Sequence, residues 1–429
     1  MLARTIAMAV AFLFSVVDSG FAVSAEREPL RARDFVDRLG VNTKFKDVGG
    51  LYDLVPGTID RMRYLGVSSM REGFPARELS PRQLRGYHAF AELGGRFIFG
   101  THNEKPVADI VADIAAFERL HPGSVKAVEG PNELNNWPIS YKGLTGAAAG
   151  KAYMSDLYAA VRNDPTLSAA GVLVYGTTDF PILVTAADVM NIHPYERHGG
   201  PSHELFRQAR DETAAAYSVE PTLGPDKRWG ITETGYQTWI GPDEYEGVDE
   251  ETQAEYGLMS LLNAVELGAL DVEWYHLQDC WGAPANGQMA FGVFDYKGAP
   301  KPLAHAIHNL TALLADPGGD ARSFPIRSRP YTMSGNLGQQ PFDGVYHLMM
   351  QKSDGTHMLA VWREGRLWDP KEHKRVPLSP AITTIVLGEP ASKVEVFDLL
   401  KGTDPIEVLE NSKQIDLMLG SSPLMLRIH

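Results

Sequence analysis

The sequence has one cysteine, Cys280, among 429 residues, so it has no internal disulfide, and the paired CxxC motifs of zinc ribbons are absent. Basic residues are also scarce relative to acidic ones, with 40 Lys and Arg against 54 Asp and Glu, giving a net charge of −14. Proteins that bind nucleic acids concentrate Lys and Arg, so this balance argues against a nucleic-acid partner. With 44% hydrophobic and 22% charged residues, the chain has the composition of an ordinary globular protein.

Several catalytic and ion-binding motifs are missing as well. The chain has no GxSxG nucleophile elbow, no GxxxxGK[ST] phosphate loop, no HExxH helix and no EF-hand loop. Serine hydrolases built on that elbow, P-loop NTPases, zincins and EF-hand proteins therefore find no support. We expect no cofactor and no metal.

The first 25 residues are predicted to be a secretory signal peptide. Arg4 precedes an apolar run from Ile6 to Val17, and Val23-Ser24-Ala25 suits cleavage before Glu26. As a helix the run covers about 18 Å, whereas a bilayer core needs about 30 Å. We therefore expect a periplasmic or extracellular protein without a stable membrane anchor.

From about residue 35 to 315, short β-rich runs alternate with helical patterns, which is typical of parallel βα units. This pattern favours a (β/α)8 barrel over a doubly wound open sheet. The expected helices span 56–65, 81–93, 106–120, 147–162, 204–217, 251–267 and 302–314. The expected strands span 38–43, 67–72, 96–101, 125–130, 171–176, 188–193, 228–233 and 271–277.

After Asp316 the pattern changes to short alternating runs with turn signals such as Asp354-Gly355, which indicate antiparallel strands. The runs are 345–350, 357–362, 383–387, 393–399, 414–419 and 424–428. The expected organisation is a signal peptide (1–25), a (β/α)8 catalytic barrel (26–318) and a small C-terminal antiparallel β-sandwich (319–429). A segment near the mature N-terminus is expected to complete the sandwich.

Polar side chains fall at or just after the predicted strand ends, where barrel enzymes carry their chemistry. They come from five different strands, and chance placement accounts poorly for so many. They are Arg71, His102, Asn103, Asn132, Glu133, His193, Tyr195 and Glu233.

Glu133 and Glu233 follow the fourth and seventh predicted strands, so a barrel would bring them to the same mouth. Cleavage of a glycosidic bond needs such a pair of carboxyl groups, one as acid and one as nucleophile, about 5–5.5 Å apart in retaining enzymes. The acid needs a raised pKa, while the nucleophile must stay ionised. This placement makes the two glutamates the candidate catalytic residues.

At these residues the sequence resembles the clan of retaining glycoside hydrolases built on (β/α)8 barrels. Asn132-Glu133 matches that clan's Asn-Glu pair, which implies Glu133 as acid/base and Asn132 as partner of the substrate 2-hydroxyl. Glu233 matches the nucleophile and Arg71 the arginine beside it, while His193-Pro194-Tyr195 is similar to the clan's His/Tyr element. Phe291–Asp295 followed by Gly298–Pro302 resembles glycoside hydrolase family 39 and its exopolysaccharide-cleaving relatives.

The eighth strand departs from the clan's pattern, in which a Trp floors the subsite of the cleaved sugar. Here Trp274 stands one residue early in Trp274-Tyr275-His276, and a one-residue shift turns a side chain to the other face. Either Tyr275 takes the floor position or Trp281 supplies it from the loop. Tyr236 and Trp281 are the aromatic residues expected in the cleft.

Other residues are expected to have structural roles. His193, His198 and His203 are five residues apart and have Glu196 nearby, but a loop is favoured there over a metal site. Glu129 and Glu104 are expected to be solvated or salt-bridged loop acids, and Cys280 a buried or semi-buried thiol.

The resulting prediction is a secreted retaining β-glycoside hydrolase acting on a polysaccharide or oligosaccharide, with endo action on a bacterial exopolysaccharide as first choice. The alternatives are an exo-acting β-xylosidase-like enzyme and a carbohydrate-binding barrel that has lost turnover. Nothing in the sequence indicates the oligomeric state.

Overall fold

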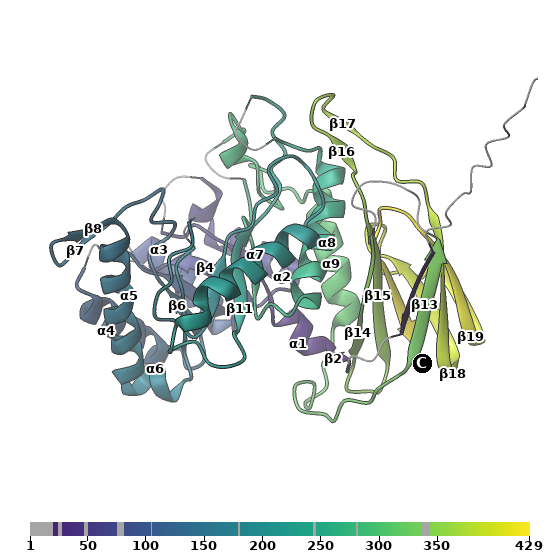
Figure 1. The fold of residues 1–429 in the computed structure, drawn as a ribbon, viewed down its shortest axis with the longest axis horizontal. Coiled ribbons are helices and arrows are strands. Elements are labelled where there is room, and N and C mark those ends of the chain that lie inside the picture. The colour runs from purple at the N-terminus through teal and green to yellow at the C-terminus, as the bar shows by residue number, and fades with distance from the viewer. Residues whose placement is uncertain are drawn as a thin grey trace, which may run out of the picture.

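A computed structural model gives the fold of the chain. The structure describes residues 20–24, 28–46, 50–74, 81–103, 105–178, 181–242, 246–279, 282–336 and 344–429. Figure 1 shows two parts: a barrel of parallel strands surrounded by helices, and an antiparallel β-structure that contains the C-terminus.

The barrel strands form one parallel sheet in the order β10-β11-β12-β3-β4-β5-β6-β9. A parallel bridge between Tyr175 and Val189 joins β9 to the residue before β10 and closes the circle. The predicted (β/α)8 architecture is therefore confirmed. The strands are β3 (Leu39–Asn42), β4 (Ser69–Gly73), β5 (Arg96–Gly100), β6 (Val125–Glu129), β9 (Leu173–Tyr175), β10 (Met190–Ile192), β11 (Trp229–Thr234) and β12 (Val272–Trp274).

The long helices around the barrel begin and end within one residue of the predicted bounds. Local signals explain this agreement: Gly66 ends α2 with a φ of 72°, and the Asp249 side chain accepts from Thr252 N at the start of α8. They are α2 (Val55–Leu65), α3 (Pro81–Glu92), α4 (Val107–Leu120), α5 (Gly146–Asn163), α7 (His203–Ala216), α8 (Glu250–Glu266) and α9 (Pro302–Leu314). Short helices α1 (Ala32–Val36) and α6 (Pro165–Ala169), and the hairpin of β7 (Ser140–Tyr141) and β8 (Leu144–Thr145), were not predicted.

The C-terminal strands form a sheet in the order β1-β13-β18-β20-β15-β14-β2, with β19 paired to β18, and all neighbours are antiparallel except β14 and β2. The runs predicted at 383–387 and 393–399 are one strand, β18, which shifts register between Val386 and Ala391. The strands are β1 (Gly20–Ser24), β2 (Leu30–Arg31), β13 (Tyr331–Asn336), β14 (Gly344–Gln351), β15 (His357–Glu364), β18 (Ala381–Asp398), β19 (Glu407–Leu419) and β20 (Leu424–Ile428). A small hairpin joins β16 (Trp368–Asp369) to β17 (Lys374–Arg375).

Strand β15 links the two parts because its alternate residues belong to different cores. Leu359 and Val361 pack inside the C-terminal sheet, whereas Met358 and Trp362 join the barrel core. Trp362 Nε1 donates to Asn263 Oδ1 of α8 (2.8 Å), and Figure 1 shows α8 and α9 beside β14 and β15. The C-terminal part therefore packs against the side of the barrel that α8 and α9 form.

The predicted signal peptide lies outside the described residues except for 20–24. These five residues form β1, which pairs antiparallel with β13, and β2 pairs with β14 as expected for a segment near the N-terminus. No helix among the described residues has the length and apolar character required to cross a membrane.

Candidate active site

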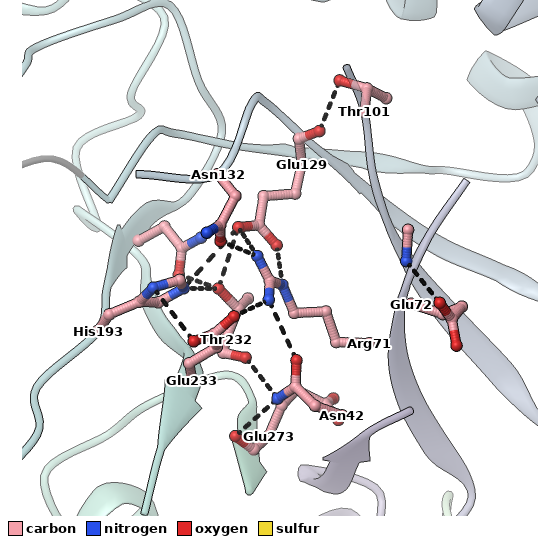
Figure 2. Close-up of polar contacts among 12 residues, drawn as sticks. Asn42, Arg71, Glu72, Thr101, Glu129, Asn132, His193, Thr232, Glu233 and Glu273 are labelled. Carbon is pink, nitrogen blue, oxygen red and sulfur yellow. Dashed lines mark hydrogen bonds and ion pairs between the residues drawn. The ribbon is translucent and has the colours of Figure 1, made fainter. Parts of the chain in front are cut away.

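The predicted site residues meet at the carboxyl ends of the barrel strands. Arg71 lies in β4 and Glu233 in β11, while Glu133 and His193 follow β6 and β10. Figure 2 shows the side chains of Glu129, Asn132 and Asn42 directed at the Arg71 guanidinium, which also binds Glu233. Residues distant in sequence thus form one connected cluster, as the barrel closure requires.

Arg71 is buried and makes five hydrogen bonds with four residues. Its Nε and Nη2 donate to the two oxygens of Glu129 (2.6 and 2.8 Å), which makes the pair bidentate. Nη2 also donates to Asn132 Oδ1 (2.7 Å), and Nη1 donates to Asn42 Oδ1 (3.1 Å) and to Glu233 Oε1. Burial would lower the pKa of Arg71, but Glu129 and Glu233 raise it above its ordinary value. Arg71 is therefore a fixed cation.

Glu233 has the environment expected of a permanently ionised carboxylate. Its side chain is 12% exposed, and Tyr195 donates its hydroxyl to Oε2 (2.8 Å). Burial raises the pKa of Glu233, but His193 and Arg71 outweigh this effect, so the pKa lies below 4.5. Burial and the neighbouring Glu233 raise the pKa of the Tyr195 hydroxyl, which keeps it a hydrogen-bond donor.

Glu133 lies in a strained loop rather than in a strand. Its φ is 41°, in the left-handed region that side chains other than Gly seldom adopt and that occurs often at active sites. The Glu133 carbonyl accepts from the backbone N–H groups of both Asn136 and Trp137 (2.8 Å each), which holds this turn. The side chain is 22% exposed and points to the mouth that Glu233 also faces.

The protonation of Glu133 differs from the expectation for an acid. Burial raises the pKa of Glu133, but hydrogen bonds with His193 Nδ1 (2.9 Å) and Asn136 Nδ2 (2.9 Å) outweigh this and lower it to about 2. The predicted raised pKa is therefore wrong for the ligand-free site. In this state both glutamates are ionised at neutral pH.

Three residues support the site; Thr232 and Asn42 were missed from sequence, and Glu129 has one of its two expected roles. Glu129 is 1% exposed and holds Arg71, so it is the salt-bridged acid of the two expected roles and not a solvated one. Thr232 Oγ1 contacts His193 Nε2 (2.9 Å) and donates to Glu129 Oε1 (3.2 Å), which orients the imidazole. Asn42 donates to the Thr232 carbonyl (2.9 Å). Their position at or near the ends of predicted strands was the sequence signal that could have identified these residues.

A cleft of about 360 Å³ opens beside this cluster. Tyr275 lines this cleft, in agreement with one of the two alternatives given for the eighth strand. Trp274 is buried. Trp137 also lines the cleft and is 69% exposed. The lining residues are Asn42, Thr43, Lys44, Lys46, Arg71, Glu72, Gly73, Gly100, Thr101, His102, Asn132, Trp137, Glu233 and Tyr275.

Two predicted binding residues lie elsewhere. Tyr236 is only 4% exposed, stacks with Tyr256 and Trp274, and donates its hydroxyl to the Gly200 carbonyl (2.8 Å), so its assignment to the cleft is wrong. The chain turns after β11 and directs this ring into the core. Asn103 donates to the Ser140 carbonyl (2.9 Å) and is not among the cleft-lining residues.

Three further residues, Trp281, Glu104 and Cys280, lie outside the described residues, so the expectations for them stay predictions.

The three histidines considered for a metal site do not converge. His198 Nδ1 lies 3.2 Å from Glu246, and His203 Nε2 lies 3.2 Å from Glu266. Among the described residues, one group could hold a metal ion: donor atoms of Glu133, His193 and Glu233 lie within 4.8 Å of one another. The same distance shows that oxygens of the two carboxylates face each other across the mouth.

The fold and this paired-carboxylate site can be compared with known proteins. No protein-family model matches the chain, and no curated protein matches its sequence. Among solved structures, a family 39 glycoside hydrolase from the gut symbiont Bacteroides cellulosilyticus WH2 is similar, with 14% identity and a TM-score of 0.60. The match covers 92% of this chain and 82% of that one, so the barrel and the β-sandwich recur together.

A Ruminococcus gnavus β-glucuronidase also matches, with 18% identity and a TM-score of 0.46, over 64% of this chain and 49% of that one. At these identities the likeness concerns the fold.

Replacing Arg71 with Met should destabilise the protein in a pH-dependent way. The variant leaves the Glu129 and Glu233 carboxylates buried without their cation, which costs about 3–5 kcal/mol at pH 7. In the wild type the lowered pKa of Glu233 contributes stability above pH 4.5 that is lost on acidification. In the variant, burial raises the pKa of Glu233, so protonation at low pH removes the cost of a buried, unpaired charge. The difference in unfolding free energy between wild type and variant should therefore narrow from pH 7 to pH 4.

Urea denaturation followed by circular dichroism measures this difference. Arg63→Met is the matched control, because Arg63 pairs with Asp60 on the surface and should cost little at either pH. A cost for Arg71→Met that is small, or equal at pH 7 and pH 4, would contradict the central role of the cation.

Proposed function

We propose that the protein is a retaining β-glycoside hydrolase in which Glu233 is the nucleophile and Glu133 the acid/base. The observation that carries the proposal is the approach of the two carboxylates, with oxygens within 4.8 Å, at the mouth of a (β/α)8 barrel. Retaining enzymes hold their carboxyl groups about 5–5.5 Å apart, whereas inverting enzymes leave room for a water between them.

The surroundings of each glutamate support these roles. Arg71 and Tyr195 keep Glu233 ionised and directed at the cleft, as a nucleophile requires. Asn132 accepts from Arg71 through its amide oxygen, which leaves its amide nitrogen to donate to a sugar hydroxyl. Glu133 is more exposed than Glu233, as suits a group that exchanges protons with solvent.

The reaction proceeds by double displacement. The Glu233 carboxylate attacks the anomeric carbon while Glu133 gives its proton to the glycosidic oxygen, and the bond to the leaving sugar breaks. Glu133, now ionised, takes a proton from water, and the resulting nucleophile cleaves the ester to Glu233 and restores the carboxylate. Each step balances without a cofactor.

The low pKa of Glu133 sets a condition on the first step. The carboxyl must gain a proton before it can act as acid, and it lies 2.9 Å from His193 Nδ1. A bound sugar excludes water from the exposed part of Glu133, which disfavours the ionised form and raises its pKa in the required direction. Substrate binding therefore prepares the acid.

The substrate is proposed to be a polysaccharide, cleaved within the chain, with a bacterial exopolysaccharide as first choice. Trp137 supports this proposal because an indole that is 69% exposed on the cleft offers an apolar face for a further sugar ring. An exo-acting β-xylosidase-like enzyme would need only the sugar next to Glu233. A carbohydrate-binding barrel without turnover would not need two opposed carboxylates.

Replacing either glutamate with Gln should lower kcat/KM by at least about 100-fold, since general acid/base catalysis alone contributes that much. The measurement is release of reducing ends from a polysaccharide panel, with NMR detection of the first product's anomeric configuration. We expect retention, and a 2-fluoro glycoside should label Glu233. Glu196→Gln, outside the cluster, is the matched control.

Inversion of configuration, or labelling of another residue, would contradict the nucleophile assignment. If the wild type hydrolysed no substrate but bound one as tightly as both Gln variants do, the binding-protein alternative would replace the enzyme.

Trp137→Ala should weaken action on long substrates. Loss of a stacking partner worth about 0.5–1.5 kcal/mol lowers kcat/KM about two- to tenfold, and the loss should grow with oligosaccharide length. Leu120→Ala is a suitable control, because Leu120 is also exposed but lies at the end of α4. This end precedes the amino end of β6, whereas the cleft lies at the carboxyl ends of the strands. An equal loss on the shortest cleavable substrate and on polymers would contradict an extended cleft.

Export is proposed from the N-terminal sequence. N-terminal sequencing of the protein recovered from periplasm or medium should find Glu26 as the first residue. A recovered chain that retains residues 20–24, and with them β1, would refute cleavage at Ala25.

A further inference from the structure

One wall of the cleft is cationic although the protein is acidic. Lys44 and Lys46 follow β3 and line the cleft together with Arg71. Lys44 Nζ lies 5.4 Å from the centre of the Tyr275 ring, which also lines the cleft. Both lysines therefore belong to the cavity that Glu233 borders.

The segment that carries the lysines is held in place by Glu72. Its Oε2 accepts from Thr43 Oγ1 (2.8 Å) and from Phe45 N (2.7 Å), and its Oε1 accepts from Gly73 N (3.1 Å). Gly73 makes room for the second lysine, because a Cβ there would come 2.5 Å from Lys46 Nζ. The end of β4 is thus shaped around a lysine side chain.

Apart from Arg71, which Glu129 and Glu233 share, the charged lining residues are Lys44, Lys46 and Glu72, and both lysines act electrostatically on Glu72. Burial raises the pKa of Glu72 to about 7, which further reduces the negative charge there near neutral pH. A cleft of one sign concentrates ligands of the other sign.

The position of Glu233 shows which part of the substrate enters the cavity. Glu233 lines it, whereas Glu133 is not one of the lining residues. In the proposed mechanism the sugar that becomes attached to the nucleophile stays beside it, and the leaving sugar departs past the acid. The cavity is therefore the site of the retained sugar.

We infer that the retained sugar carries a negatively charged substituent, which Lys44 and Lys46 bind. This inference deepens the proposed function and rests on it. The shared chemistry is that of an acidic sugar, whose charge comes from the carboxylate of a uronic acid or from a sulfate ester. Either group accepts charge-assisted hydrogen bonds from ammonium groups.

Matched pairs of polysaccharides test the inference. Each uronic-acid polymer is compared with its carboxyl-reduced form, and each sulfated polymer with its desulfated form, so that backbone and linkage stay constant while the charge is removed. We expect kcat/KM to be at least about tenfold higher for the acidic member of one pair. The pair that shows the preference identifies carboxylate or sulfate.

Lys44→Met and Lys46→Met remove the charge but keep most of the side-chain length. Each substitution should reduce the preference for the acidic substrate, which is kcat/KM for the acidic member of a pair divided by kcat/KM for the neutral member, by about tenfold. Thermal denaturation checks that each variant is folded. Lys413→Met, on exposed β19 of the C-terminal sheet, is the matched control and should leave the ratio as in the wild type.

The outcomes separate this inference from the proposed function. Hydrolysis of neutral members as fast as acidic ones, or equal losses on both members in the lysine variants, overturns the acidic sugar and leaves the glycosidase standing. If no polymer is hydrolysed, the proposed function fails. Fluorescence titration with the same matched pairs then tests whether the lysine site binds the acidic member. Preferential binding of the acidic oligosaccharide supports the lysine site, and equal binding refutes it.

Discussion

The buried ion pair between Arg71 and Glu129 is the interaction around which the mouth of the barrel is arranged. A guanidinium inside a protein needs its charge balanced and its donors paired, and Glu129 meets both needs with two parallel hydrogen bonds. The remaining donors then reach Asn132, Asn42 and Glu233. One side chain of β4 thereby sets the positions of groups from β3, β6 and β11. Such a pair is a poor source of net stability, so its value lies in fixing geometry and charge.

The two glutamates differ in how firmly they are held, and this difference matches the roles proposed for them. Glu233 belongs to a strand and is held by Arg71 and Tyr195, so its carboxylate has little freedom. Glu133 stands in a left-handed turn, is more exposed, and shares hydrogen bonds with His193 and Asn136. Covering its exposed part with a ligand changes its solvation more than that of Glu233. In the proposed mechanism the nucleophile is therefore preset, whereas the protonation of the acid/base responds to substrate.

The barrel and the members of the site were predictable from sequence because they depend on periodicity and on position at strand ends. Glu133, Glu233, Arg71, His193 and Tyr195 follow from that rule, and the structure brings them together. The direction of side chains in loops was not predictable, because it depends on the path of the chain. Tyr236 turns into the core for this reason, although it lies three residues after Glu233. Glu129 looked like an ordinary acid because its partner is 58 residues away in sequence.

Net charge illustrates the same limit on reasoning from composition. The value of −14 argues against polyanionic partners as long as charge is averaged over the surface. Screening restricts the reach of exposed charges to about 8–10 Å at physiological salt, so a ligand in the cleft responds mainly to the groups that line it. There Glu129 and Glu233 share the single positive charge of Arg71, and Glu72 accepts from backbone and hydroxyl donors. Lys44 and Lys46 after β3 add two cationic groups to this lining, and the inferred binding of an anionic sugar by an acidic protein depends on them.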